Sequence, residues 1–348
     1  MKTKEFLNKR QLNWILTFIS LLVGFALTIL FALGIGATQI NYFLITKILI
    51  SKIIPIHNDR PDYFEAIIIG VRLPRILLAS LVGAGLAIAG GSMQGLFRNP
   101  LASPYVTGIA SGASFGASLA IILSLGTGGI APLAFLFSVT TSFLVYFIAK
   151  TKGRISISSL LLAGIAISLF FSALVSFMQY IAGERQLRQI VFWLMGGLWA
   201  SNWEKVIMSL PLILSGSLGI LFFSRDLNIL LSGEESALNL GVDVENVRKM
   251  VLVLASLVTA TCVSFCGVIG FVGLVVPHIM RLIVGPDHRI LLPSSFLAGA
   301  IFLIWTDTLA REIIAPTELP VGIITAILGV PFFLFLLRSR KKQMGFWK

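Results

Sequence analysis

Residues 76–97 read ILLASLVGAGLAIAGGSMQGLF, a stretch without a single charged side chain. A helix rises 1.5 Å per residue, so about 20 residues cross a hydrocarbon core of roughly 30 Å. A segment that spans lipid must be helical, because no water is present there to satisfy its backbone N–H and C=O groups. The stretch therefore predicts a transmembrane helix.

The composition of the whole chain supports the same reading. Of its 348 residues, 57% are hydrophobic and only 12% are charged, whereas a soluble domain carries about 25% charged residues. These values exclude an ordinary soluble globule, a disordered chain and a disulfide scaffold. The net charge of +12 would indicate a nucleic-acid partner only if the basic residues gathered on a soluble face. Here they punctuate apolar runs, so we expect no nucleic-acid partner.

Similar charge-free stretches recur along the chain. Two of them, 99–149 and 250–280, are too long for one crossing, and both contain glycines and prolines that favour a break. The apolar run near the N-terminus exceeds the about 7–15 residues of a signal peptide, so we expect a retained first span. The sequence thus predicts an all-α polytopic membrane protein with ten spans: 14–35, 72–96, 105–125, 130–149, 156–181, 205–223, 250–268, 271–284, 291–310 and 319–337.

The basic residues predict the orientation of these spans. With ten spans, 18 Lys and Arg residues fall on the side of both termini and 9 on the other side. By the positive-inside rule, both termini are then cytoplasmic. We interpret 189–203 as a shallow helix at the outer surface, because an eleventh span would export the basic cluster 338–342. The predicted outer loop covers about 37–64.

Three arginines lie on the outer side, which this rule depletes of positive charge. Arg72 and Arg75 flank a Leu-Pro step at the mouth of the second span, and Arg311 lies at the outer end of the ninth. One interpretation is that they snorkel to lipid headgroups. The other is a cationic rim that receives acidic groups of a docking protein, since the planar guanidinium pairs bidentately with carboxylates.

The one substantial inner loop predicts two short helices. Ser232 and Glu235 match a capping box, in which each side chain hydrogen-bonds to the other residue's backbone N–H. Gly241 fits the position just past a helix, and Asp243 fits the N-cap of the next helix. Such a pair forms a compact knob that another protein can grip. A helix lying on anionic headgroups is less favoured, because Glu234 and Glu235 would be repelled.

Two ionisable residues lie within predicted spans. Asp307 is one turn before Arg311, an i, i+4 spacing that suits a structural ion pair. His278 follows a proline and could cap freed carbonyls. Ion coupling through these two residues is the alternative, and it would make the chain a secondary transporter or channel.

Several chemical signals are absent from the sequence. It contains no Gly-x-x-x-x-Gly-Lys-[Ser/Thr] motif to hold ATP phosphates, no cluster with metal-ligand spacing and no evident nucleophile–base pair. We therefore expect no catalytic residue, no metal site and no cofactor bound by this chain. An intramembrane enzyme is correspondingly disfavoured.

An ordered series of motifs from about 72 to 337 closely resembles the iron-siderophore, haem and vitamin B12 permease family of ABC importers. The matching pieces are RLPR at 72–75, VGAGLAIAGG at 82–91, RNPLASP at 98–104, LLLAG at 160–164, ALNLGV at 237–242, GVIGFVGLVVPHIMR at 267–281 and ELPVG at 318–322. Residues 1–65 carry little of the resemblance. It implies a type II ABC importer permease fold, with residues 1–348 forming one transmembrane permease domain.

The resemblance also implies partners and residue roles. It implies a homodimer in the cytoplasmic membrane, two cytoplasmic ATPase subunits that hold ATP and Mg²⁺, and an external substrate-binding protein, with membrane lipid around the spans. Arg72, Arg75 and Arg311 match arginines that meet acidic residues of the binding protein. Segment 232–249 matches the coupling helices seated in the ATPases, and the residues assigned to coupling are Ser232, Glu234, Glu235, Ala237, Leu240, Gly241 and Asp243.

The translocation path implied by the family follows the dimer axis, lined partly by the fifth and tenth spans. Asn99 and Leu101 match an inner gate, and Ile157 and Ser158 match a second inner constriction. Ile157 departs from the small polar residue of some members. We expect the cargo to be a metal chelate, with a ferric siderophore first, followed by haem, cobalamin or an oxyanion such as molybdate.

Overall fold

The computed structural model describes residues 2–36, 38, 40–52, 62–151 and 154–340. In these residues the chain is helical, apart from a two-residue strand pair, β1 (Lys150–Thr151) with β2 (Arg154–Ile155). Ten helices coincide with the ten predicted spans: α1 (Lys2–Gly34), α4 (Leu73–Leu96), α5 (Ile109–Ile122), α6 (Gly126–Ala149), α7 (Ile157–Ile181), α9 (Trp203–Phe222), α12 (Val244–Cys266), α13 (Val272–Val284), α14 (His288–Glu312) and α15 (Val321–Arg340). The predicted all-α, ten-span architecture is confirmed.

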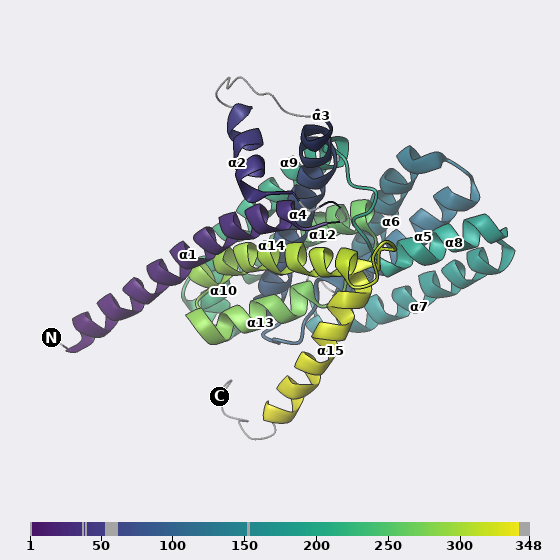
Figure 1. The fold of residues 1–348 in the computed structure, drawn as a ribbon. Coiled ribbons are helices and arrows are strands. Elements are labelled where there is room, and N and C mark those ends of the chain that lie inside the picture. The colour runs from purple at the N-terminus through teal and green to yellow at the C-terminus, as the bar shows by residue number, and fades with distance from the viewer. Residues whose placement is uncertain (1, 37, 39, 53–61, 152–153, 341–348) are drawn as a thin grey trace.

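The helix α4 lies at the centre of the bundle, where it contacts α9, α12, α13 and α14 (Figure 1). Glycine makes these contacts possible. A Cβ on Gly83 would lie 2.2 Å from the carbonyl oxygen of Gly299 in α14, and one on Gly90 would lie 1.7 Å from that of Gly273 in α13. The backbones therefore approach as closely as small residues permit, which is how helices associate in lipid, where no hydrophobic force drives them together.

The bundle has two chemically different ends. We call the end that holds Arg72, Arg75 and Arg311 the arginine end, and the opposite end, which holds α10 (Ser224–Leu230) and α11 (Glu234–Asn239), the knob end. The Trp14 Nε1 in α1 donates to the carbonyl of Val284, 3.0 Å away, near the knob end. Since α15 starts at the arginine end and runs away from it, the described chain begins and ends on the same side.

The long helix that contains Arg72 begins about ten residues earlier in the chain than predicted. Helical structure begins with α3 (Asp62–Glu65) and passes through a π-helical segment, η1 (Ala66–Arg72), directly into α4. Proline has no N–H to donate to the preceding turn and its ring crowds that turn. The wider π turns that precede Pro74 accommodate it, so the Arg-Leu-Pro-Arg motif lies inside a long helix and not at its mouth.

Three other boundaries differ from the sequence-based prediction. The helix α2 (Tyr42–Ser51), capped by the Asn41 side chain, occupies part of the predicted outer loop. The helix predicted to lie shallow at the outer surface corresponds to α8 (Glu184–Met195), which starts before the predicted 189 and ends where Gly196 adopts φ +68° against the carbonyl of Val268. The segment before α5 is a short 3-10 helix, η2 (Pro104–Thr107). Each difference reflects a local cap or a neighbouring backbone, which hydropathy does not register.

Gly90→Ala should lower the free energy of unfolding of the purified protein by about 1–3 kcal/mol, because the added methyl has no space against the backbone of Gly273. Gly128→Ala is the matched control, since a Cβ there meets nothing within 4 Å. Unfolding in detergent, followed by tryptophan fluorescence, measures both. Equal melting temperatures for the two variants would contradict the tight α4–α13 contact.

Candidate functional site

The arginine end is organised around one buried carboxylate, Asp307 of α14. The guanidinium of Arg75 donates to both Asp307 oxygens, at 2.8 to 3.1 Å, and to both oxygens of Glu318, at 2.9 and 3.0 Å. The Nε of Arg311 lies 3.4 Å from Asp307 Oδ2, which confirms the predicted i, i+4 ion pair. The cluster therefore ties α4, α14 and the segment before α15 together.

Arg72 is held separately, by backbone oxygens near the end of α1. Its Nη1 donates to the carbonyl of Leu33 at 2.6 Å, and its Nη2 donates to that of Thr38. The turn between them approaches the arginine closely: Gly36 adopts φ +153°, and a Cβ on it would lie 2.8 Å from Arg72 Nη2. Arg72 thus fastens α1 to α4.

The three arginines predicted to form a cationic rim are therefore together at one end, but they are largely covered. Arg72 is 6% exposed and Arg75 is 8% exposed, and both donate to groups of the same chain. Asp307 is buried and paired with two arginines, an arrangement that fits a structural ion pair better than the ion-coupled alternative. The most accessible member is Glu318, whose side chain is 38% exposed.

The knob at the other end is built by local backbone rules. Past the end of α11, Gly241 adopts φ +80°, its N–H donates to Leu238, and the next N–H, of Val242, donates to Ala237, each at 3.0 Å. This is a Schellman motif, and it confirms the predicted role of Gly241. The Asp243 side chain accepts from the Asn246 N–H at 3.1 Å, so the predicted N-cap of α12 is also confirmed.

The predicted capping box at Ser232 and Glu235 is wrong. The Ser232 hydroxyl donates to the carbonyl of Ile229, 2.7 Å away, and therefore belongs to the preceding turn. Gly233, with φ +112°, takes the N-cap position of α11, which starts at Glu234. A chain reversal that only glycine tolerates well displaced the side-chain cap by one residue.

Two sets of contacts attach the knob to the bundle. The buried guanidinium of Arg248 in α12 pairs with Glu234 of α11 and with Glu245, at 2.9 Å for the latter. The amide of Asn228 in α10 donates to Asp287 at 2.7 Å and accepts from the backbone N–H of His288 at 2.8 Å. Hydrogen bonds from the Arg289 side chain lower the pKa of Asp287 to about 2, so it stays ionised at neutral pH. The knob is thus fixed to both α12 and α14.

The knob exposes two large aliphatic side chains among polar ones. Leu238 and Leu240 are 60% and 67% exposed, while Ala237 between α11 and the bundle is buried. Glu235 is exposed and Glu234 is engaged by Arg248. Large aliphatic side chains exposed together on a rigid projection are typical of a surface that another protein covers.

The predicted gate residues lie toward the knob end, where α4 ends and α7 begins. The Asn99 side chain accepts from the Leu101 N–H at 3.0 Å and so shapes the turn after α4. Ile157 and Ser158 form the first turn of α7, capped by Ser156. The structure gives Asn99 a local structural role and leaves gating by these four residues a prediction.

A hollow of about 360 Å³ lies between α7 and η2, at the edge of the exposed face of α7. Its lining includes the hydroxyls of Ser168 and Ser172 and the backbone at Gly164, where a Cβ would lie 2.0 Å from the carbonyl of Val106. Around it, the side chains of α7 are apolar and exposed, and α15 diverges from the bundle (Figure 1). This face is the candidate wall of the translocation path.

Three contributors to these sites were not predicted from the sequence: Glu318 as the second partner of Arg75, Arg248 as the anchor of α11, and Asn228 as the anchor of α10. Arg75 and Glu318 are 243 residues apart, and Asn228 and Asp287 are 59 residues apart, so no local pattern connects either pair. Arg248 differs, because its pair with Glu245 has a local i, i+3 spacing that could have been found in the sequence. No group of three His, Cys, Asp or Glu side chains within the described ranges could hold a metal ion.

A family model and several known proteins are similar to this chain. The model of the FecCD transport family matches residues 22–339. The chain is 48% identical over 288 residues to the cobalamin import system permease protein of Halobacterium salinarum, covering 82% of this chain and 77% of that protein. It is 39% identical over 332 residues to the hemin transport system permease protein of Yersinia pestis, covering 93% and 98%.

One solved structure is similar over almost its whole length. It is described as an inward-facing conformation of a metal-chelate type ABC transporter, with a TM-score of 0.83 and 37% identity, and the match covers 92% of this chain and 98% of that one.

Asp307→Asn should destabilise the protein by about 3–5 kcal/mol, because it leaves two buried guanidinium groups with only Glu318 between them. Glu65→Gln is the matched control, since Glu65 pairs with Lys52 in the open, where an ion pair contributes at most about 1 kcal/mol. Denaturant unfolding of both variants in the same detergent makes the comparison. A similar small loss for both would mean that the cluster does not stabilise the fold.

Proposed function

The chain belongs to the FecCD transport family, and from this premise we propose that it is the homodimeric, cytoplasmic-membrane permease through which a metal chelate enters the cell. The premise itself carries several conclusions. The chain is a multi-pass membrane protein and the permease of a type II ABC importer, in a family whose members carry iron chelates, haem, cobalamin or molybdate. It is not itself an enzyme and binds no cofactor of its own; ATP is bound by the partner ATPase.

The observation that best supports the proposal is the knob. Leu238 and Leu240 are exposed on a segment that is fastened to both α12 and α14. We place this end in the cytoplasm, in contact with an ATPase subunit, where the excess of basic residues is found. A movement of the knob would then displace two long helices of the bundle, α12 and α14.

A second copy of the chain would complete the path. The exposed apolar side chains of α7 and the divergence of α15 leave a wide uncovered face, on which the hollow near Ser168 and Ser172 lies. Two such faces packed about a common axis enclose a passage with walls from α7 and α15. Asn99, Leu101, Ile157 and Ser158 would close it at the cytoplasmic end.

The relatives bear on the choice of cargo. The sequence alone favoured a ferric siderophore, whereas the cobalamin permease is 48% identical to this chain and the hemin permease 39%. Cobalamin is therefore the first cargo to test and a ferric siderophore the second. Both are large metal chelates, and the specificity resides largely in the external binding protein.

The binding protein would dock at the arginine end, where one of its carboxylates would replace an ion pair within this chain. Arg75 is fully paired in the isolated chain, but Glu318 is partly exposed and leaves one side of that guanidinium open to competition. A carboxylate of the docking protein can replace Glu318 while Asp307 keeps its place. Docking therefore depends on how firmly Glu318 holds Arg75.

The transport function is tested with the complex assembled from this chain, its co-encoded ATPase and its co-encoded binding protein in proteoliposomes. Radiolabelled cobalamin or ferric siderophore should accumulate only with ATP and all three components. Leu240→Asp should keep the fold but reduce ATPase association and uptake severalfold, since it places a charge where an apolar contact forms. Leu123→Asp, the same change at an exposed position at the arginine end, is the control. Uphill uptake by this chain alone, or unchanged coupling in Leu240→Asp, would refute the proposal.

Glu318→Gln should strengthen docking of the binding protein up to about fivefold, because Arg75 loses a competing intrachain carboxylate. Glu65→Gln removes an exposed carboxylate from the same end without touching Arg75 and should leave the affinity unchanged. Affinities are measured by surface-based binding at two salt concentrations. Weaker docking in Glu318→Gln would show that Glu318 contacts the partner directly.

A further inference from the structure

A second hollow lies between α6 and α12, away from α7 and α15. It has a volume of about 250 Å³ and is lined mainly by aliphatic and aromatic side chains, among them Val139, Phe143, Leu252, Val253 and Leu257. An apolar cavity of about 150 Å³ stays dry and takes up a molecule as large as benzene. This hollow therefore has room for a stretch of hydrocarbon, and water gains nothing by entering it.

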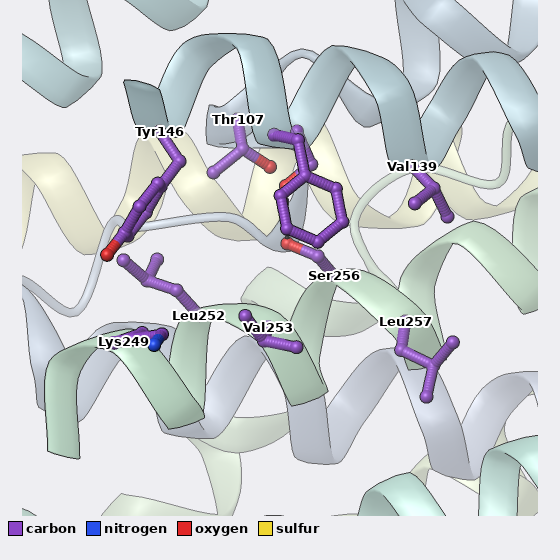
Figure 2. A pocket seen from close by; sticks show the side chains of 10 residues that line it. Thr107, Val139, Tyr146, Lys249, Leu252, Val253, Ser256 and Leu257 are labelled. Atoms are coloured by element: carbon purple, nitrogen blue, oxygen red, sulfur yellow. Dashed lines mark hydrogen bonds between the residues drawn. The ribbon is translucent and has the colours of Figure 1, made fainter. Parts of the chain in front are cut away.

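The polar groups of this hollow are arranged in a definite order along it. Figure 2 shows Tyr146 of α6 and Lys249 of α12 together at one end, with Val139 and Leu257 at the other. Lys249 lies in the second turn of α12, close to the knob, so the polar end faces the knob end of the bundle. The long axis of the hollow thus follows the direction of α6 and α12 through the membrane.

Two of these groups have no partner among the residues that the structure describes. Lys249 is exposed, and no hydrogen bond or ion pair joins it to another described residue. The Thr107 side chain is 2% exposed, and its Oγ1 has no hydrogen-bond partner among the described residues. A buried hydroxyl without a partner is costly. By contrast, Ser142 and Ser256, which also line the hollow, bind each other across 2.8 Å.

The order of the groups along the hollow, from charged to polar to apolar, matches one class of molecule. A cation and a phenol at the mouth suit a phosphate, the buried Thr107 hydroxyl suits an ester carbonyl, and the apolar remainder suits an acyl chain. A second copy of this chain would have to bring an anion and an acceptor together on one apolar helix, and the face with room for that copy is formed by α7 and α15. Lys249, and Lys150 four residues after Tyr146, favour a lipid of negative charge.

We propose that the groove between α6 and α12 binds one anionic glycerophospholipid of the leaflet that borders the knob end. Lys249 and Tyr146 hold its phosphate, Thr107 donates to an ester carbonyl, and one acyl chain lies along Val253 and Leu257. This leaflet is the cytoplasmic one in the orientation proposed above. Since α12 also anchors α11 through the ion pair of Arg248 with Glu234, the lipid lies against the helix that carries the knob.

Native mass spectrometry of the delipidated protein, titrated with palmitoyl-oleoyl phosphatidylglycerol or with phosphatidylcholine of the same chains, tests the proposal. The wild type should retain one phosphatidylglycerol preferentially. Lys249→Gln should weaken that retention about fivefold and abolish the preference over phosphatidylcholine. Arg225→Gln removes another exposed positive charge at the same end and should change neither value.

Two further variants separate the parts of the site. Thr107→Val should weaken both lipids equally, because the ester is common to them. Val253→Phe should exclude both by filling the hollow, whereas Leu218→Phe, on the exposed face of α9, should not. Equal retention of the two lipids by the wild type, full retention by Val253→Phe, or loss of the lipid whenever the protein dimerises would each overturn the proposal.

Discussion

The close approach of backbones at α4 is the constraint on which the rest of the structure depends. Lipid is as apolar as leucine, so these helices associate through packing and hydrogen bonds and not through exclusion of water. At Gly83 and Gly90 no Cβ separates α4 from α14 and α13. Because four helices pack directly on this one, a displacement of α14 at one end of the bundle cannot be absorbed by loose packing in the middle.

The two ends use this rigid centre in opposite ways. At the arginine end, charge is buried and paired: Asp307 joins Arg75 of α4 to Arg311 of its own helix. At the knob end, apolar side chains are exposed on a segment that Arg248 and Asn228 fasten to α12 and α14. The helix α14 begins beside Asp287 and ends beside Arg311, so it spans the distance between the proposed ATPase contact and the proposed docking contact. In the proposed function, that continuity is the physical route by which closure of the ATPases would reach the arginine end.

The sides of the bundle also differ from one another. The uncovered face of α7 and α15 suits a second copy, whose approach would enclose the hollow beside Ser168 and Ser172. The groove between α6 and α12 combines an apolar slot with an ammonium and a buried hydroxyl that have no partner in the described part of the chain, and together these suit a lipid. A lipid in that groove and a nucleotide-driven partner at the knob would act on the same helix, α12. Under both proposals, the composition of the membrane would influence coupling through α12.

The sequence by itself determined the spans, their number and several of their caps, because each is set by neighbours in the chain. A charge-free run must become a helix in lipid, and Gly241 and Asp243 act on backbone groups within four residues. Even local signals fail when a neighbour competes, as when Gly233 took the cap position predicted for Ser232. Only the tertiary structure decided that Arg75 meets Asp307 and Glu318, 232 and 243 residues away, and so is buried instead of free. A charged side chain in a sequence shows what it can bind, but its partner is selected by the packing of helices, which brings distant residues within reach.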